Sequence, residues 1–225
     1  MKSGEPRENG EVAELYAARQ LERVAEHWDA KAAAWDRDLQ DPACHLNEDD
    51  AYARFLDALA HEVGQRQDFC REHGLIDVGC ATGLVLASIV SNFAWGLGID
   101  ISPEMVRLSQ AKAIPKSRFA IGDCFHLAAH GHRAGAVVSR GVLLSHYGRQ
   151  NASALLESFR SALVPGGFVL CDFLNRTAMN AFMHITTQKT YYTGSDISQL
   201  ARAAGFQTAR VLNEPERRVQ LLLAE

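Results

Sequence analysis

The sequence predicts one α/β domain whose central sheet is doubly wound and mostly parallel. Three observations indicate this fold. After Gly74, short apolar runs alternate with helical segments, a glycine-bearing turn joins the first run to a helix, and the last two runs follow each other with no helix between them. Short apolar runs separated by helices are typical of parallel strands that are buried on both faces.

Length and composition favour a single globular domain. The chain has 225 residues, of which 47% are hydrophobic and 22% are charged, and this size fits one core. A formal net charge of -4 offers no broad basic field, so we expect neither nucleic acid nor a membrane as a partner. No apolar segment reaches the roughly 18 residues of a membrane-spanning helix, and the first residues lack the apolar region of a signal peptide. We therefore expect a cytoplasmic protein.

Cysteine and histidine spacing points to reduced thiols and to no metal site. The five cysteines are odd in number and have no CxxC spacing, which is not the pattern of a disulfide framework. The nine histidines form no HExxH motif.

The N-terminal third of the chain is predicted to be helical. Residues 1–11 are polar and contain Gly4, Pro6 and Gly10, so we expect a flexible tail there. Residues 12–73 hold apolar side chains at helical spacing in two segments, which predict two helices that form an N-terminal lid. Residues 74–225 are predicted to form the core that carries the sheet.

Seven strands are expected in the sheet. Their sequences are LIDVG, WGLGID, RFAIGD, AGAVVSRG, GFVLCDF, FQTARVL and VQLLLAE. Ser102 and Pro103 are typical of a helix start, and Gly205 is typical of the residue after a helix end. The last two strands are joined only by NEPERR, so they should form an antiparallel hairpin at the sheet edge.

The strongest functional signal is LIDVGCATG at residues 75–83, which reads as a strand, a turn and the start of a helix. Gly79 can adopt backbone angles that other residues avoid, and the unpaired N–H groups of a helix start can face a negatively charged group. A cofactor with such a group fits this turn. The alternative is a tight strand-to-helix connection without a ligand.

Two aspartates at the ends of the next two strands make that signal specific. Asp100 ends GLGID about twenty residues after the turn, where a carboxylate accepts hydrogen bonds from both hydroxyls of a ribose. Its alternative role, to cap the following helix, is already filled by Ser102. Asp123 ends RFAIGD, where a carboxylate can bind the exocyclic amine of adenine, unless it is only a solvent-facing turn residue. Together the aspartates indicate an adenosine-type ligand.

These motifs resemble those of the class I S-adenosylmethionine-dependent methyltransferases, in the branch of methyltransferase-domain families that modify small molecules. The resemblance covers roughly residues 25 to 225. It is carried by DVGCATG, GIDISPEMV, IGDCF and SALVPGGFVL in the order and spacing of the family, and more weakly by HWDAKAAAWD. It implies a Rossmann-like fold, S-adenosyl-L-methionine as the cofactor and methyltransferase activity.

The resemblance also implies where each part of the cofactor would bind. The methionine portion would contact Asp77, Gly79, Cys80, Ala81 and Gly83, with Trp35 over its end; the ribose Asp100 and Ile101; the adenine Met105, Asp123, Cys124 and Phe125; and the methyl group Ser139, Arg140 and Gly141. One position departs from the family, which usually has glycine where this chain has Ala81. The added methyl group narrows the approach of the backbone to the ligand.

The acceptor is expected to be a small molecule, such as a secondary metabolite, methylated on oxygen or nitrogen. If it is a hydroxyl, His146 is the candidate general base, although a histidine in this loop can instead shape the cofactor pocket. Candidate substrate-binding residues are Tyr147, Asn175, Arg176 and Tyr191. The segment that holds the last three is short, which disfavours a protein substrate.

Two other functions compete with this one. A nicotinamide-dependent oxidoreductase would show GxGxxG, whereas this turn reads GCATG, so that motif does not fit. A protein of methyltransferase fold that binds S-adenosylmethionine in a non-methylating or regulatory role stays open as the alternative.

Overall fold

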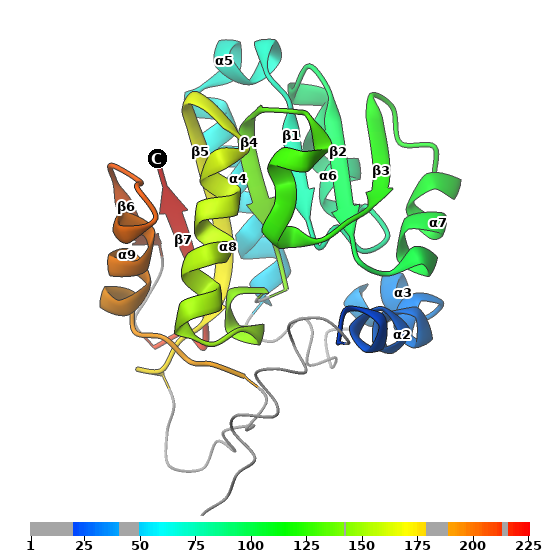
Figure 1. The fold of residues 1–225 in the computed structure, drawn as a ribbon. Coiled ribbons are helices and arrows are strands. Elements are labelled where there is room, and N and C mark those ends of the chain that lie inside the picture. The colour runs from blue at the N-terminus through cyan, green and yellow to red at the C-terminus, as the bar shows by residue number, and fades with distance from the viewer. Residues whose placement is uncertain (1–19, 41–49, 142, 179–188, 213–215) are drawn as a thin grey trace, which may run out of the picture.

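The computed structural model describes residues 20–40, 50–141, 143–178, 189–212 and 216–225. The predicted tail at residues 1–11 lies outside these ranges. Figure 1 shows a central sheet with α8 (Arg149–Ser161) in front of it and α4 (Ala51–Gln65) behind it. Within the described ranges, no helix combines the length and the apolar character needed to cross a membrane.

The sheet has seven strands in the order β3-β2-β1-β4-β5-β7-β6. The strands are β1 (Leu75–Val78), β2 (Gly96–Asp100), β3 (Ser117–Ile121), β4 (Ala134–Ser139), β5 (Leu163–Leu174), β6 (Ala209–Leu212) and β7 (Val219–Ala224). β1 to β5 run parallel, whereas β7 pairs antiparallel with both β5 and β6. The predicted mostly parallel sheet and its C-terminal hairpin are confirmed.

The strand order predicts a ligand-binding crevice at the carboxyl edge of the sheet. The order runs outward in one direction from β1 to β3 and in the other from β4 to β5, so β1 and β4 are neighbours at the point where the direction reverses. In open α/β sheets, ligands bind outside the carboxyl ends of the strands at this switch point. Asp77 lies opposite Gly98 and Val78 opposite Ile99, so the ends of β1 and β2 meet there.

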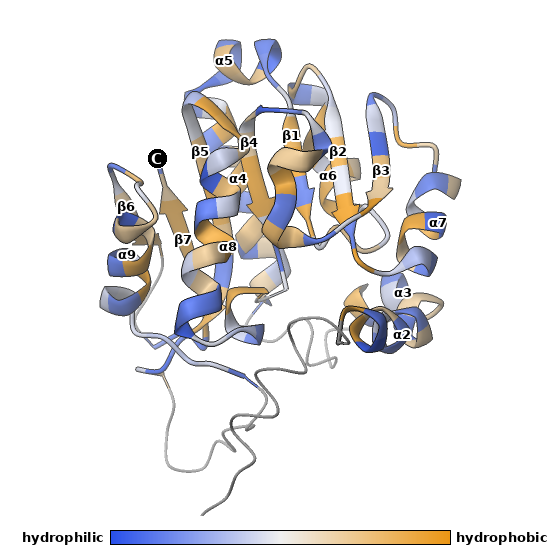
Figure 2. Cartoon of the chain, viewed as in Figure 1, coloured by the Kyte–Doolittle hydropathy of each residue, from blue (hydrophilic) through white to orange (hydrophobic). Residues whose placement is uncertain are grey.

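Helices cover both faces of the sheet. They are α2 (Gln20–Ala32), α3 (Trp35–Gln40), α5 (Gln67–Glu72), α6 (Leu84–Ile89), α7 (Pro103–Ala111), α9 (Gly194–Ala203) and the short 3-10 helices η2 (Val90–Asn92), η3 (Cys124–His130) and η4 (Leu143–His146), in addition to α4 and α8. One apolar cluster joins the sheet to α8 and α9, and a second joins it to α4 and α6. In Figure 2 the strands are largely apolar and the outer helix surfaces are polar, as expected for strands buried on both faces.

The N-terminal region is divided more finely than its periodicity predicts. Where two helices were expected, the described residues form four, α2 to α5. Arg66 leaves the helical conformation with φ -131° and separates α4 from α5, and its guanidinium pairs with Glu62 at 3.0 Å and with Glu225 at 2.7 Å. α4 packs in the core beneath the sheet, whereas α2 and α3 lie at the carboxyl edge (Figure 1). We therefore define the lid as α2 and α3 alone.

Predicted helix boundaries are present at α7 and α9. The Ser102 hydroxyl accepts a hydrogen bond from the Met105 N–H at 3.1 Å, and Pro103 is the first residue of α7. Gly205 follows α9 with φ +93°, a conformation that favours glycine. The start of α7 lies directly after β2, so this cap fixes the backbone beside Asp100.

Candidate active site

The glycine turn after β1 is tied to β2 by its backbone. The N–H groups of Gly79 and Cys80 both donate to the Ile99 carbonyl, at 2.8 and 3.1 Å. Gly79 and Gly83 have positive φ, +70° and +83°, which the turn requires. A Cβ added at Gly79 would meet no atom within 4 Å, and the same holds for Gly141 after β4. Open space therefore borders the backbone at both sides of the switch point.

Ala81 sits in the left-handed region, with φ 46°. This conformation costs an L-residue roughly 1 to 2 kcal/mol relative to glycine. Its N–H donates to the Asp100 carboxylate at 2.8 Å. The departure from the family pattern thus adds a methyl group and backbone strain at one residue, and leaves the turn in place.

Asp100 is nearly buried and its two oxygens have different partners. Oδ2 accepts from the Ala81 N–H at 2.8 Å, and Oδ1 accepts from the Ser102 N–H at 2.9 Å. Burial raises the pKa of Asp100, and these hydrogen bonds oppose the rise. A carboxylate has about four acceptor sites, so capacity remains for ribose hydroxyls.

Asp77 is a buried carboxylate with an unused oxygen. The side chain is 1% exposed, and its Oδ2 has no hydrogen-bond partner among the described residues. Burial and, secondarily, the negative charge of Asp100 raise the pKa of Asp77 to about 8. An unsatisfied acceptor beside the open space at Gly79 fits the ammonium group of a methionine moiety, and the predicted cofactor is compatible with the residues present.

The residues predicted to surround adenine lie at the ends of β2 and β3. Met105 is fully buried. Asp123 accepts from the Phe125 N–H at 3.0 Å and pairs with His126 at 2.7 Å, so its carboxylate caps η3. Cys124 Sγ lies 3.6 Å from the hydroxyl of Tyr147, whose ring meets the Phe125 ring edge-on.

The residues at the end of β4 join three strands. The Ser139 hydroxyl donates to the Val78 carbonyl at 2.9 Å, which ties β4 to β1. The Gly141 N–H donates to the Asp172 carboxylate of β5 at 3.1 Å. The Arg140 guanidinium lies 5.1 Å from the ring of Tyr52 on α4. The Ser139 side chain is buried, and its hydrogen bond to Val78 ties it to the sheet.

The lid is hydrogen-bonded to the loops that follow β1 and β2. Asp29 on α2 accepts from the Ser102 hydroxyl and, at 3.0 Å, from the Glu104 N–H at the start of α7. Asp36 on α3 accepts from the Thr82 hydroxyl of the glycine turn and pairs with Lys112 at 2.6 Å. The lid therefore contacts both loops that flank the crevice.

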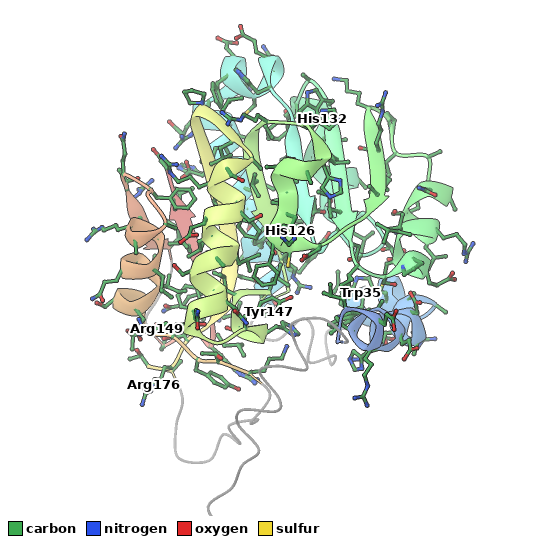
Figure 3. All side chains as sticks on the ribbon, in the orientation of Figure 1. Trp35, His126, His132, Tyr147, Arg149 and Arg176 are labelled. Atoms are coloured by element: carbon green, nitrogen blue, oxygen red, sulfur yellow. The ribbon has the colours of Figure 1, made fainter. Side chains whose placement is uncertain are left out.

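Trp35, predicted to cover the methionine end, packs edge-on against Trp28 with ring centroids 5.7 Å apart. The Trp28 ring in turn lies 6.0 Å from the His146 ring. Figure 3 places Trp35 and Tyr147 at the edge of the sheet where the strands end. Aromatic rings from the lid and from η4 thus meet at this edge.

His146 contacts a residue that the sequence did not single out, Lys189. The Lys189 Nζ lies 2.9 Å from His146 Nδ1. Burial first, and then the charge of Lys189, lower the pKa of His146 to about 3, and a hydrogen bond with the Gly141 backbone opposes this. Burial and the charge of Lys31 lower the pKa of Lys189 to about 8. His146 is therefore neutral at pH 7.

The other residues predicted to bind substrate have varied surroundings. Asn175 is buried, donates to the Arg217 carbonyl at 3.0 Å and accepts from the Thr177 N–H at 3.0 Å, which favours a structural role. Arg176 is exposed and points outward in Figure 3. The Tyr191 hydroxyl is buried and has no hydrogen-bond partner within the described ranges. Of these residues, Tyr147 lies nearest the crevice, through its contacts with Cys124 and Phe125.

Comparisons with known proteins agree with this geometry. Residues 75–167 match the model of a family described as a methyltransferase domain. No curated protein matches the chain by sequence.

Solved structures share the fold at low identity. Magnesium protoporphyrin IX methyltransferase from Synechocystis PCC 6803, with bound S-adenosylhomocysteine, has a TM-score of 0.71 and 19% identity over 89% of this chain and 97% of that one. An S-adenosylmethionine-dependent methyltransferase from Clostridium acetobutylicum has a TM-score of 0.67 and 11% identity over 85% and 98% of the two chains. The sugar N-methyltransferase KedS8 from Streptoalloteichus has a TM-score of 0.65 and 16% identity over 78% and 89%.

The family match spans the glycine turn, both predicted ribose and adenine aspartates and the first four strands of the sheet. Residues 75–167 therefore match a methyltransferase domain, and the chain shares the fold of solved S-adenosylmethionine-dependent methyltransferases.

Proposed function

We propose that this enzyme methylates an oxygen or nitrogen atom of a small molecule. The observation that carries the proposal is the lid, which contacts the glycine turn through Asp36 and the start of α7 through Asp29. An acceptor must then fit beneath α2 and α3. Two structural neighbours are named for small acceptors, magnesium protoporphyrin IX and a sugar.

The donor would be held along the ends of β1, β2 and β3. We assign Asp77 to its ammonium group, Asp100 to its ribose hydroxyls and Asp123 to the adenine amine, with Gly79 and Gly141 bordering the space between. Once bound, the donor supplies a methyl group that is already activated for transfer. The protein then has to align the acceptor and exclude water, and the lid serves both needs.

His146 is proposed to line the acceptor site. A base with a pKa of about 3 binds a proton weakly at neutral pH, which disfavours general-base catalysis. Its ring instead accepts a hydrogen bond from Lys189 and contacts Trp28. In His146→Gln, a positioning role predicts lower turnover with an unchanged pH profile, whereas a general base predicts that an ascending limb of the profile is lost.

Transfer itself is tested with a labelled methyl donor. The protein is incubated with donor and with small hydroxyl and amine acceptors, and labelled product is separated by chromatography. We expect product with at least one acceptor, a strong decrease in Asp100→Ala and no change in Asp68→Ala, which removes an exposed carboxylate at the opposite edge. Donor binding without transfer to any acceptor would instead support the non-methylating alternative.

A further inference from the structure

Four basic side chains from three separate segments gather at the lid side of the crevice. Lys189 Nζ lies 2.9 Å from His146 Nδ1, and the His146 ring lies 6.0 Å from the Trp28 ring. Lys31 Nζ lies 4.9 Å from the centre of the same Trp28 ring. The His27 ring packs edge-on against the same Trp28 ring, with centroids 5.1 Å apart. Burial first, and then the charges of Lys31 and Lys189, lower the pKa of His27. We call Lys31, Lys189 and His146 with Trp28 the basic cluster.

Among the described residues, no ion pair neutralises the positive charge of the basic cluster. Within the described part of the chain, neither Lys31 nor Lys189 has a carboxylate within ion-pair distance. Asp172 raises the pKa of Lys189, but less than burial and Lys31 lower it, and one Asp172 oxygen accepts from the Gly141 N–H. Asp29, on the same helix as Lys31, is bound to the start of α7.

This arrangement is costly for the protein alone and favourable for an anion. Lys189 is partly buried, and removing an ammonium group from water costs free energy unless a counter-ion replaces the lost hydration. Lys31 adds repulsion of like charge. A negatively charged ligand between the two lysines would supply the missing counter-ion and reduce that repulsion, since charge-assisted hydrogen bonds are the stronger class. The His146 ring is neutral at pH 7, so it carries no negative charge that would repel an anion.

We propose that the acceptor carries an anionic oxygen group, a carboxylate, phosphate or phosphonate, bound between Lys189 and Lys31 with its organic part against Trp28. This inference rests on the proposed function, because it names the class of small molecule that the enzyme methylates. The protein has a formal net charge of -4, so the preference for an anion is local to the basic cluster.

The test compares anionic and neutral probes of similar shape. Protein is first titrated with S-adenosylhomocysteine by calorimetry and, once saturated, with benzoate, phenylphosphonate and benzyl alcohol. We expect the two anions to bind at least tenfold more tightly than benzyl alcohol. Lys189→Met should weaken anion binding at least tenfold, and the exposed Lys31→Met by a smaller factor. Lys116→Met is the matched control, because Lys116 precedes β3 at the opposite edge of the sheet, and it should bind the anions as the unmodified protein does.

Any of three results would overturn the inference. These are benzyl alcohol binding as tightly as benzoate, absence of anion binding, and unchanged anion affinity in both lysine variants. The first titration keeps the donor site separate, since normal S-adenosylhomocysteine affinity in Lys189→Met shows that this variant is folded. Methylation of neutral acceptors at the rate of anionic ones would overturn the inference and leave the proposed function intact, whereas absence of transfer to both kinds would count against the proposed function.

Discussion

The two sides of the crevice are built in different ways. The proposed donor half comprises residues 77–83, 100–105 and 123–125, where Asp100 and Asp123 accept hydrogen bonds from backbone N–H groups. The proposed acceptor half comprises Trp28, Lys31, residues 143–147 and Lys189. There His146 contacts Trp28 and Lys189 across long sequence separations, and Lys31 lies over Trp28 on the same helix.

This difference matches what each half has to recognise. Every methyltransferase of this class binds the same donor, so a rigid frame of strand ends and tight turns serves it. The acceptor varies among enzymes, and side chains on a lid and on loops can change without disturbing the sheet. The following experiments test whether the donor half is rigid and the acceptor half is chemically tuned.

Close packing behind the donor half, where β2 contacts Cys80 and β3, should make Gly98 of β2 intolerant of a side chain. A Cβ there would lie 2.4 Å from Phe119 and 2.8 Å from Cys80, so Gly98→Val should lower the free energy of unfolding by about 3 kcal/mol, as overpacked cores do. Gly64→Ala is the control, because a Cβ in this part of α4 meets nothing within 4 Å and should stabilise by roughly 0.5 to 1 kcal/mol. Urea unfolding measures both; equal stability of the two variants would contradict a rigid donor half.

The acceptor half should make stability depend on pH through His146. Its pKa is about 3 in the folded protein and 6.5 for an unperturbed histidine, so below pH 6.5 the unfolded chain binds a proton that the folded protein does not. The stabilisation is present above pH 6.5 and is lost as the pH falls towards 3. Between pH 6.5 and 5, the unfolding free energy relative to His146→Gln should fall by about 2 kcal/mol. A constant difference between the two proteins would show that this histidine is not tuned by its surroundings.

Asp100→Ala tests the donor half by affinity. It removes the acceptor for the Ala81 and Ser102 N–H groups and for the ribose, so S-adenosylhomocysteine should bind at least tenfold more weakly, about 1.4 kcal/mol. Calorimetry measures this, and Asp68→Ala on α5 should leave the affinity unchanged. An unaltered affinity in Asp100→Ala would remove the ribose role.

Asp77 predicts a proton count on donor binding. With a pKa of about 8, it is largely protonated at pH 6.5, and a bound ammonium group favours the carboxylate. Binding of S-adenosylhomocysteine at pH 6.5 should therefore release close to one proton, which calorimetry in buffers of different ionisation enthalpy detects. Asp77→Asn should show no such release. The same proton count in both proteins would assign the release to another group.

The smallest expected effect is at Ala81. Ala81→Gly relieves a left-handed conformation worth roughly 1 to 2 kcal/mol but gives the unfolded chain more freedom, worth roughly 0.4 to 1 kcal/mol. A net stabilisation of about 0.5 kcal/mol should appear in urea unfolding. A clear loss of stability would mean that the alanine methyl group packs favourably in the turn.

The sheet, and the placement of the turn and the two aspartates at the ends of its strands, could be predicted from sequence because local patterns encode them. Strands buried on both faces are continuous apolar runs, and the turn, Asp100 and Asp123 lie in contiguous motifs that follow these runs. The division of the N-terminal helices could not be predicted, because the break at Arg66 depends on Glu225 at the other end of the chain. Lys189 was missed for the same reason, since it is 43 residues from His146 and no local pattern marks it.

The two acidic contacts of the lid have a mechanical consequence. Asp29 attaches α2 to the α7 start and Asp36 attaches α3 to the glycine turn, while Trp28 and Lys31 of the basic cluster lie on α2. A displacement of the α7 start would therefore pass through Asp29 to Trp28 and Lys31 on the same helix. Binding at one side of the crevice is in this way mechanically coupled to the position of the groups at the other side.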